Sequence, residues 1–240
     1  MGNEHLSKQF DADLETLRSA VLQMGGLVES QIRGAIEAFS SGNQDLIDQV
    51  ISSELRVNGF EVNIDNECSH IIVKRQPAAS DLRLIMAISK TVTDLERIGD
   101  EAEKIARMSK QIHEHGRIQV QSFGNIRHAA DIALSMLWQA LDAFARLDTV
   151  AAAGIIREDL AIDSEFRSIL RQLITFMMED PRTISTALEI VWVAKAVERI
   201  GDHAKNIAEY VIYIVKGTDV RHTTFEHIER EALGEGIGQA

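Results

Sequence analysis

The sequence has few of the residues that crosslink a chain or interrupt its helices. Its single cysteine, Cys68, excludes an internal disulfide, and only two prolines, Pro77 and Pro181, occur in 240 residues. Aromatic residues make up 5% of the chain. Neither a basic-apolar signal segment nor an uncharged run long enough to span a bilayer is present. We therefore expect a cytoplasmic protein.

Basic side chains are also in short supply relative to acidic ones. The chain has 25 lysines and arginines against 37 aspartates and glutamates, a formal net charge of −12. Such an excess repels nucleic acid and anionic lipid at long range. No glycine-rich phosphate-binding loop occurs either. Neither nucleic acid nor a membrane surface is an expected direct partner.

The residues that are abundant, Ala, Leu, Ile, Glu and Arg, favour long helices over strands. Apolar periodicity and chain breakers predict six of them, at residues 10–39, 45–75, 80–115, 121–147, 149–178 and 182–216. Short connections make successive helices antiparallel neighbours, so the predicted fold class is all-α. After residue 217 we expect a mobile polar tail with one short helix at residues 225–233.

One six-residue motif occurs twice, as LERIGD at Leu95–Asp100 and as VERIGD at Val197–Asp202. Other segments match in the same order along the chain: Ala38-Phe39 with Ala143-Phe144, Asn63–Glu67 with Ala161–Glu165, and Pro77 with Pro181. The chain is therefore a duplication. We expect two tandem three-helix bundles, residues 1–118 and 119–217, followed by the tail at residues 218–240.

Each expected bundle carries two acidic pairs with four-residue spacing, which are Glu61/Asp65 and Glu96/Asp100 in the first half, and Asp159/Asp163 and Glu198/Asp202 in the second. On a helix this spacing places like charges side by side, at a cost of about 0.2–0.5 kcal/mol per pair. The acids lie one position beyond the apolar seam, so they border the core. Carboxylates without thiolates or imidazoles suit hard cations such as Mg²⁺, Mn²⁺, Ca²⁺ or iron. We expect one metal site per bundle.

Two other interpretations of the acidic residues stay open. The pairs can be solvated helix faces, because a lysine follows both Asp100 and Asp202 within one helical turn. A redox di-iron enzyme is the second, and it needs Glu-x-x-His on two helices. Only Glu67 and His70 match that pattern, because Ser168 stands at the equivalent position of the second half. His70 is therefore interpreted as structural.

Three further side chains are assigned to the core. Trp138 and Trp192 lie among apolar neighbours in the sequence and are predicted to be core anchors. Cys68 lies near the apolar seam of its helix, without a paired base that would make it a nucleophile. It is predicted to be a small buried hydrophobe.

The acidic pairs, the duplicated ERIGD motif and the segment Arg75–Arg83 (RQPAASDLR) together resemble the PhoU family of bacterial phosphate-signalling regulators. The resemblance covers about residues 10–217. It implies two PhoU-type three-helix bundles with multinuclear metal sites, often of iron or zinc, with manganese and magnesium also suited to the carboxylates. It assigns Glu61, Asp65, Glu96 and Asp100 to the first site and Asp159, Asp163, Glu198 and Asp202 to the second.

The same resemblance implies a function without catalysis. Members of this family link the high-affinity phosphate ABC transporter, through its ATPase, to a membrane sensor histidine kinase, and they hold the phosphate-starvation regulon off. This chain would then meet the membrane only through those partners, as a monomer or a homodimer. A metal-buffering protein and a purely structural helical oligomer are the alternatives, and the second of these predicts neither bound metal nor a signalling phenotype.

Overall fold

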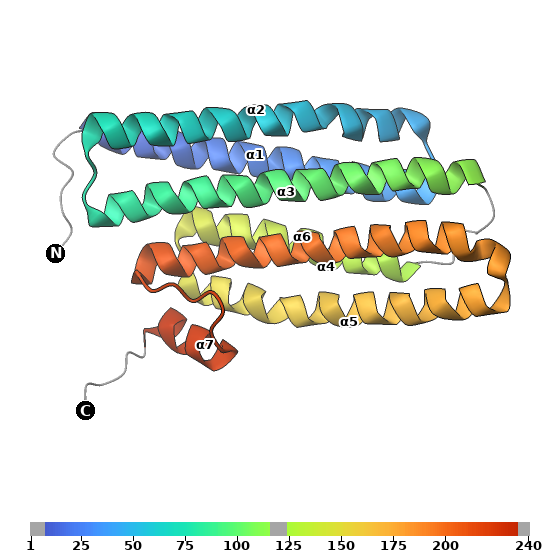
Figure 1. The fold of residues 1–240 in the computed structure, drawn as a ribbon. Coiled ribbons are helices and arrows are strands. Elements are labelled where there is room, and N and C mark those ends of the chain that lie inside the picture. Colours follow the sequence, from blue (N-terminus) through green and yellow to red (C-terminus); the bar gives the residue numbers. More distant parts are fainter. Residues whose placement is uncertain (1–7, 116–123, 235–240) are drawn as a thin grey trace.

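The computed structural model describes residues 8–115 and 124–234, and every regular element in these residues is helical (Figure 1). Six long helices follow one another along the chain, and a short helix packs beside them. Their bounds are α1 Lys8–Ser41, α2 Gln44–Arg75, α3 Ala79–His115, α4 Gly124–Arg146, α5 Thr149–Glu179, α6 Ile184–Lys216 and α7 Phe225–Leu233. The all-α prediction is confirmed.

The helix ends lie within a few residues of the predicted ones because local residues cap them. The Oδ1 atom of Asn43 accepts hydrogen bonds from the backbone N–H groups of Asp45 (3.0 Å) and Leu46 (3.2 Å) and so begins α2. Gly217 ends α6 with a φ of 78°, a conformation that costs glycine little. Helix α6 begins two residues later than predicted, because Pro181–Thr183 form a 3₁₀ turn, η2. The predicted bundle boundary at 118/119 and helix start at 121 lie outside the described residues.

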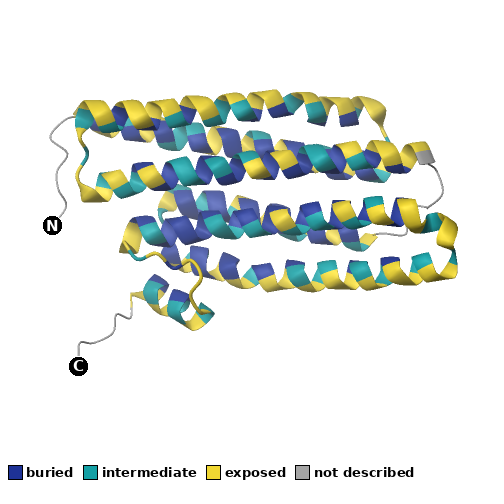
Figure 2. Cartoon of the chain, in the orientation of Figure 1, coloured by how far each residue is buried: buried dark blue, intermediate teal, exposed yellow. Residues whose placement is uncertain are grey.

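Helices α1–α3 form one three-helix bundle and α4–α6 form a second beside it (Figure 1). The most extensive contact between any two helices joins α3 to α6, which run antiparallel. Helix α1 also meets α4, where a Cβ atom on Gly25 would lie 2.6 Å from Cδ1 of Leu141. Buried apolar side chains of both bundles therefore form one continuous core, whereas α2 and α5 expose their outer faces (Figure 2).

The two tryptophans are not core anchors, contrary to the prediction. Trp138 on α4 is 58% exposed and Trp192 on α6 is 52% exposed. Their sequence neighbours Leu137 and Val193 occupy the buried face instead, since only one stripe of a helix can face the core. The Nζ atom of Lys104 lies 5.5 Å from the Trp192 ring centroid, which is a cation–π contact at the surface. The prediction for Cys68 is confirmed, because its side chain is buried.

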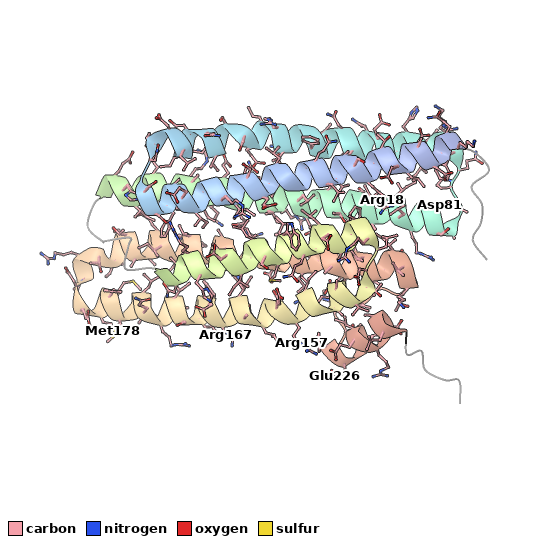
Figure 3. The ribbon with its side chains drawn as sticks, turned by 180° about the vertical axis from the view of Figure 1, so that it is seen from behind. Arg18, Asp81, Arg157, Arg167, Met178 and Glu226 are labelled. Carbon is pink, nitrogen blue, oxygen red and sulfur yellow. The ribbon has the colours of Figure 1, made fainter. Side chains whose placement is uncertain are left out.

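The segment after Gly217 is packed, rather than the mobile tail that the sequence predicts, as far as it is described. Helix α7 forms at the predicted residues and buries Ile228 and Ala232. The hydroxyl of Thr149 donates to the carbonyl of Ala232 at 2.8 Å. Arg157 of α5 pairs with Glu229 and lies 4.7 Å from the Phe225 ring centroid. Figure 3 shows Arg157 on the side of α5 that α7 covers.

The long helices carry charged residues on their outer faces. In residues 8–115 and 124–234, no helix combines the length and the apolar character that crossing a membrane requires.

Candidate functional site

The first acidic row comprises Glu61 and Asp65 of α2 with Glu96 and Asp100 of α3. These side chains border the core, because Ile64 and Leu95 beside them are buried while the acids themselves are half-buried or, at Asp100, exposed. The two helices pack directly against each other, and the hydroxyl of Ser89 on α3 donates to Asp65 at 2.7 Å. The antiparallel packing therefore brings the two acidic pairs of this half together.

Burial, followed by the negative charge of neighbouring carboxylates, raises the affinity of three acids of the first row for protons. The pKa of Glu96 is raised by burial and then by the charges of Asp100 and Glu61. The pKa of Glu61 is raised by burial and then by Asp65 and Asp100. The pKa of Asp100 is raised by burial and then by Glu103 and Glu101. A cation placed here would relieve the same repulsion that now favours the protonated forms.

A buried polar pair lies behind the first row and was missed in the sequence. Glu54 of α2 is 6% exposed and Gln31 of α1 is 2% exposed, and Nε2 of Gln31 donates to Oε2 of Glu54 at 3.2 Å. Burial raises the pKa of Glu54 to about 7, and the charges of Asp100, Glu103 and Glu96 add to it. The only available signal was that Glu54 precedes Glu61 by two helical turns and so shares its face.

Gly99 makes room for this pair where α3 crosses it. A Cβ atom at this position would lie 3.0 Å from Oε2 of Glu54 and 3.2 Å from Oε1 of Gln31. Glycine inside a helix costs about 1 kcal/mol relative to alanine, so the close approach has a stability cost. Gly99, which lies between Glu96 and Asp100 in the motif, therefore leaves space for the side chains of Gln31 and Glu54 at the edge of the first acidic row.

The second acidic row comprises Asp159 and Asp163 of α5 with Glu198 and Asp202 of α6. Asp159 is buried, and Nζ of Lys205 lies 2.7 Å from its Oδ2. Glu198 pairs with Lys195, and Asp163 pairs with Arg167 at 3.4 Å. Asp202 has its pKa raised by burial and by Glu198 and Asp159, while Lys195 and Lys205 oppose that shift. Lys195, Lys205 and Arg167 thus form direct ion pairs with acids of this row.

Glu209, two turns beyond Asp202 on α6, is a further buried acid that the sequence did not reveal. It is 7% exposed, and burial raises its pKa to about 7 despite the opposing charges of Lys205 and Arg221. Between its ordinary pKa of about 4.5 and about 7, the folded protein binds this proton more tightly than the unfolded chain. The free energy of unfolding should therefore fall as pH rises through this window.

Replacing Glu209 by glutamine is expected to remove that part of the pH dependence. Relative to the unsubstituted protein, Glu209→Gln should gain up to about 3 kcal/mol of stability between pH 5 and pH 8. Urea unfolding followed by circular dichroism at both pH values measures the gain. Glu226→Gln, at an exposed position of α7, is the control and should leave the pH dependence unchanged. An equal gain in both variants would contradict the assignment.

The donor set of the first row fits a hard, hydrated cation. All of its ligating atoms are carboxylate oxygens, which Mg²⁺ and Mn²⁺ prefer. Within the part of the chain that the structure describes, no three Asp, Glu, His or Cys side chains form a group that could hold a metal ion. Mg²⁺ commonly keeps several waters and uses only one or two carboxylates. An open row of this kind is compatible with such a cation.

The residues of the di-iron alternative do not point into a bundle. Glu67 and His70 are both exposed on α2, whereas the ligands of di-iron bundles project inward from facing helices. His70 therefore lies on the surface, outside any candidate site described above.

The fold and the two rows define a class of protein: an all-helical chain of two repeated three-helix bundles, each with a carboxylate row beside its core. A PhoU domain model matches this chain twice, at residues 21–109 and 126–211, one match in each bundle. The chain belongs to the PhoU family.

Related proteins match along almost the whole chain. The phosphate-specific transport system accessory protein PhoU homolog of Pseudomonas putida is 49% identical over 98% of this chain and 92% of its own length. Accessory protein PhoU of Escherichia coli is 46% identical over 97% of this chain and 96% of its own length. The crystal structure of PhoU from Pseudomonas aeruginosa superposes with a TM-score of 0.82 at 49% identity, covering 87% of this chain and all of that one.

Proposed function

We propose that this protein regulates phosphate transport as a non-enzymatic adaptor. The observation that carries the proposal is the likeness along almost the full chain to relatives named phosphate-specific transport system accessory proteins. In the finer form of the proposal, it couples the ATPase of the high-affinity phosphate ABC transporter to a sensor histidine kinase. It thereby represses the phosphate-starvation regulon in the cytoplasm, and it reaches the membrane only through these partners.

The architecture suits an adaptor. Helices of more than thirty residues, such as α1 and α6, are long rigid elements, and α2 and α5 present continuous exposed faces (Figure 2). A regulator of this kind needs only a different affinity for two states of its partner, and no catalytic group takes part in such a mechanism.

We also propose that the protein binds metal cations at its acidic rows. Magnesium, manganese and iron match the oxygen donors of both rows, whereas zinc would bind there without the cysteine or histidine ligands that it prefers. A bound cation would neutralise the clustered carboxylates. The chain's own contribution is to hold Glu61 and Glu96 on two packed helices, where burial and then neighbouring carboxylates raise the pKa of both side chains.

Removing the gene from its native host tests the regulatory proposal. Alkaline phosphatase output in phosphate-rich medium is expected to rise when the gene is deleted and to return to the repressed level when it is restored. The reason is that loss of the adaptor leaves the kinase without its phosphate-sufficient signal. A restored copy with an early stop codon is the control for the vector and should not repress.

Unchanged low output after deletion would contradict the adaptor role. The un-neutralised first row would then favour the second candidate function, metal buffering, in which loading with cations is the main activity. Total cell manganese and iron in the deletion strain would distinguish the two, since a buffer lowers the bound pool when it is lost.

A further inference from the structure

The duplication allows the two acidic rows to be compared position by position. In the register set by the repeated motif, Glu103 of α3 corresponds to Lys205 of α6, and Thr93 corresponds to Lys195. In the register of Asn63–Glu67 with Ala161–Glu165, Glu54 of α2 corresponds to Ala152 of α5. The four acids of each row are retained in both repeats, so the repeats differ in what surrounds the acids.

In the first repeat the positions matched to Lys195 and Lys205 hold a neutral residue, Thr93, and an acidic one, Glu103. Glu103 adds to the burial that raises the pKa of Asp100, and the hydroxyl of Thr93 donates to the carbonyl of Ser89 at 3.2 Å. Arginines lie near the row but at its rim: Arg97 acts on Glu96 and Arg199 acts on Asp100. Among the described residues, none of the four acids of the first row forms an ion pair with a lysine or arginine. This row therefore has no built-in counter-ion in direct contact.

The buried pair behind the first row points to a missing positive partner. Oε1 of Glu54 and Oε1 of Gln31 are buried, and neither has a hydrogen-bond partner. Both side chains lie against Gly99, directly beside Asp100. Unsatisfied buried acceptors destabilise a fold, and a cation or its bound water would satisfy acceptors of this kind.

In the second repeat two lysines form direct ion pairs with the acids. Lys205 pairs with Asp159 and Lys195 with Glu198. The charges of both lysines oppose the rise in the pKa of Asp202. Helix α7 lies beside the Asp159 end of this row, because Phe225 and Ile228 line the same cavity of about 380 Å³ as Asp159 and Lys205. An ammonium group is a compact point charge, and here it supplies the neutralisation that a metal ion would supply.

We infer that the two repeats have diverged in function: the first acidic row is the cation-binding site, and the second is neutralised internally by Lys195 and Lys205. This inference rests on the proposed metal binding and makes it more specific. It replaces two equivalent sites with one site that responds to cations and one that is independent of them. Asp159 and Glu198 of the second row then serve as partners for lysines within the fold.

Exchanging the matched residues between the repeats tests the inference. Binding of Mn²⁺ to the full chain, freed of metal by chelation, is measured by isothermal titration calorimetry. The unsubstituted protein should show binding at the first row only. The variant T93K/E103K, which carries the lysines of the second repeat, should lose affinity at least about tenfold. The variant K195T/K205E should gain a second class of sites.

Isosteric substitutions provide the matched controls. E96Q/D100N should abolish binding, and E198Q/D202N should leave the Kd for Mn²⁺ within about twofold of the unsubstituted protein, a difference of about 0.4 kcal/mol. Circular dichroism confirms that each variant is folded. Equal losses from E96Q/D100N and E198Q/D202N would overturn the inference while upholding metal binding. Absence of Mn²⁺ binding to every variant would overturn both.

Discussion

Replacing Asp94 by alanine is expected to lower the free energy of unfolding by about 3–5 kcal/mol, because it removes a buried carboxylate that accepts two hydrogen bonds worth about 1.5–3 kcal/mol each. Asp94 of α3 is buried at the contact between the bundles, and its Oδ1 lies 2.7 Å from Nδ1 of His203 on α6. Asn206, which is half-buried, donates to the same oxygen at 3.1 Å. The substitution would leave His203 and Asn206 without this acceptor.

A double-mutant cycle separates this cluster from general loss of packing. His203→Ala alone should also destabilise the protein, but the pair D94A/H203A should cost clearly less than the sum, because each change removes the same contact. Urea unfolding supplies all four free energies. Ala196, which occupies the position of Asp94 in the second repeat, shows that the fold accepts alanine at an equivalent place on α6. Strictly additive effects would mean that Asp94 and His203 do not act together.

Phe144→Ala is expected to cost about 3–5 kcal/mol, whereas Trp138→Ala on the same helix should cost less than about 1 kcal/mol. Phe144 is fully buried among the core side chains of α4, and its removal leaves a cavity that the surrounding helices cannot fill. Trp138, although the larger side chain, is 58% exposed. Thermal unfolding of both variants measures the difference.

Trp138→Ala is a matched control for Phe144→Ala. Both replace an aromatic side chain by alanine on α4, so helix propensity and the loss of aromatic area act in the same direction. A cost for Trp138→Ala as large as that for Phe144→Ala would place the tryptophan in the core, as its apolar sequence neighbours predict. Near-equal small costs would contradict the burial of Phe144.

Sequence patterns were sufficient to predict the positions of the helices, but not which side chains face the core or how α7 packs. Long apolar periodicity, with local caps such as Asn43 and Gly217, places the helix ends because each signal acts within a few residues. The orientation of Trp138 failed because its helix is rich in apolar residues on more than one side, so periodicity alone does not say which of them faces the core. The packing of α7 depends on contacts with Arg157 and Thr149, far away in the sequence.

The acidic pairs could likewise be predicted from the sequence, whereas the residues that surround them in space could not. Spacing of four residues identifies each pair because both members lie on one helix. Glu54 and Lys205 act on the rows across helices, so their roles depend on how the helices are rotated about one another, which no single segment encodes. The duplicated motif predicted two equivalent rows. The rows differ in the residues around them, because Lys195 and Lys205 form ion pairs with the second row.

The contact of α3 with α6 has a consequence for how the molecule folds. Each bundle buries its third helix, α3 or α6, against the other bundle. The same continuous core includes the contact of Gly25 with Leu141. Separating the bundles would expose the apolar face of α3 together with the buried charges of Asp94 and Glu101. The duplicated unit of sequence is therefore not an independent unit of folding. The two halves gain their stability cooperatively, because each covers apolar side chains that the other would otherwise expose.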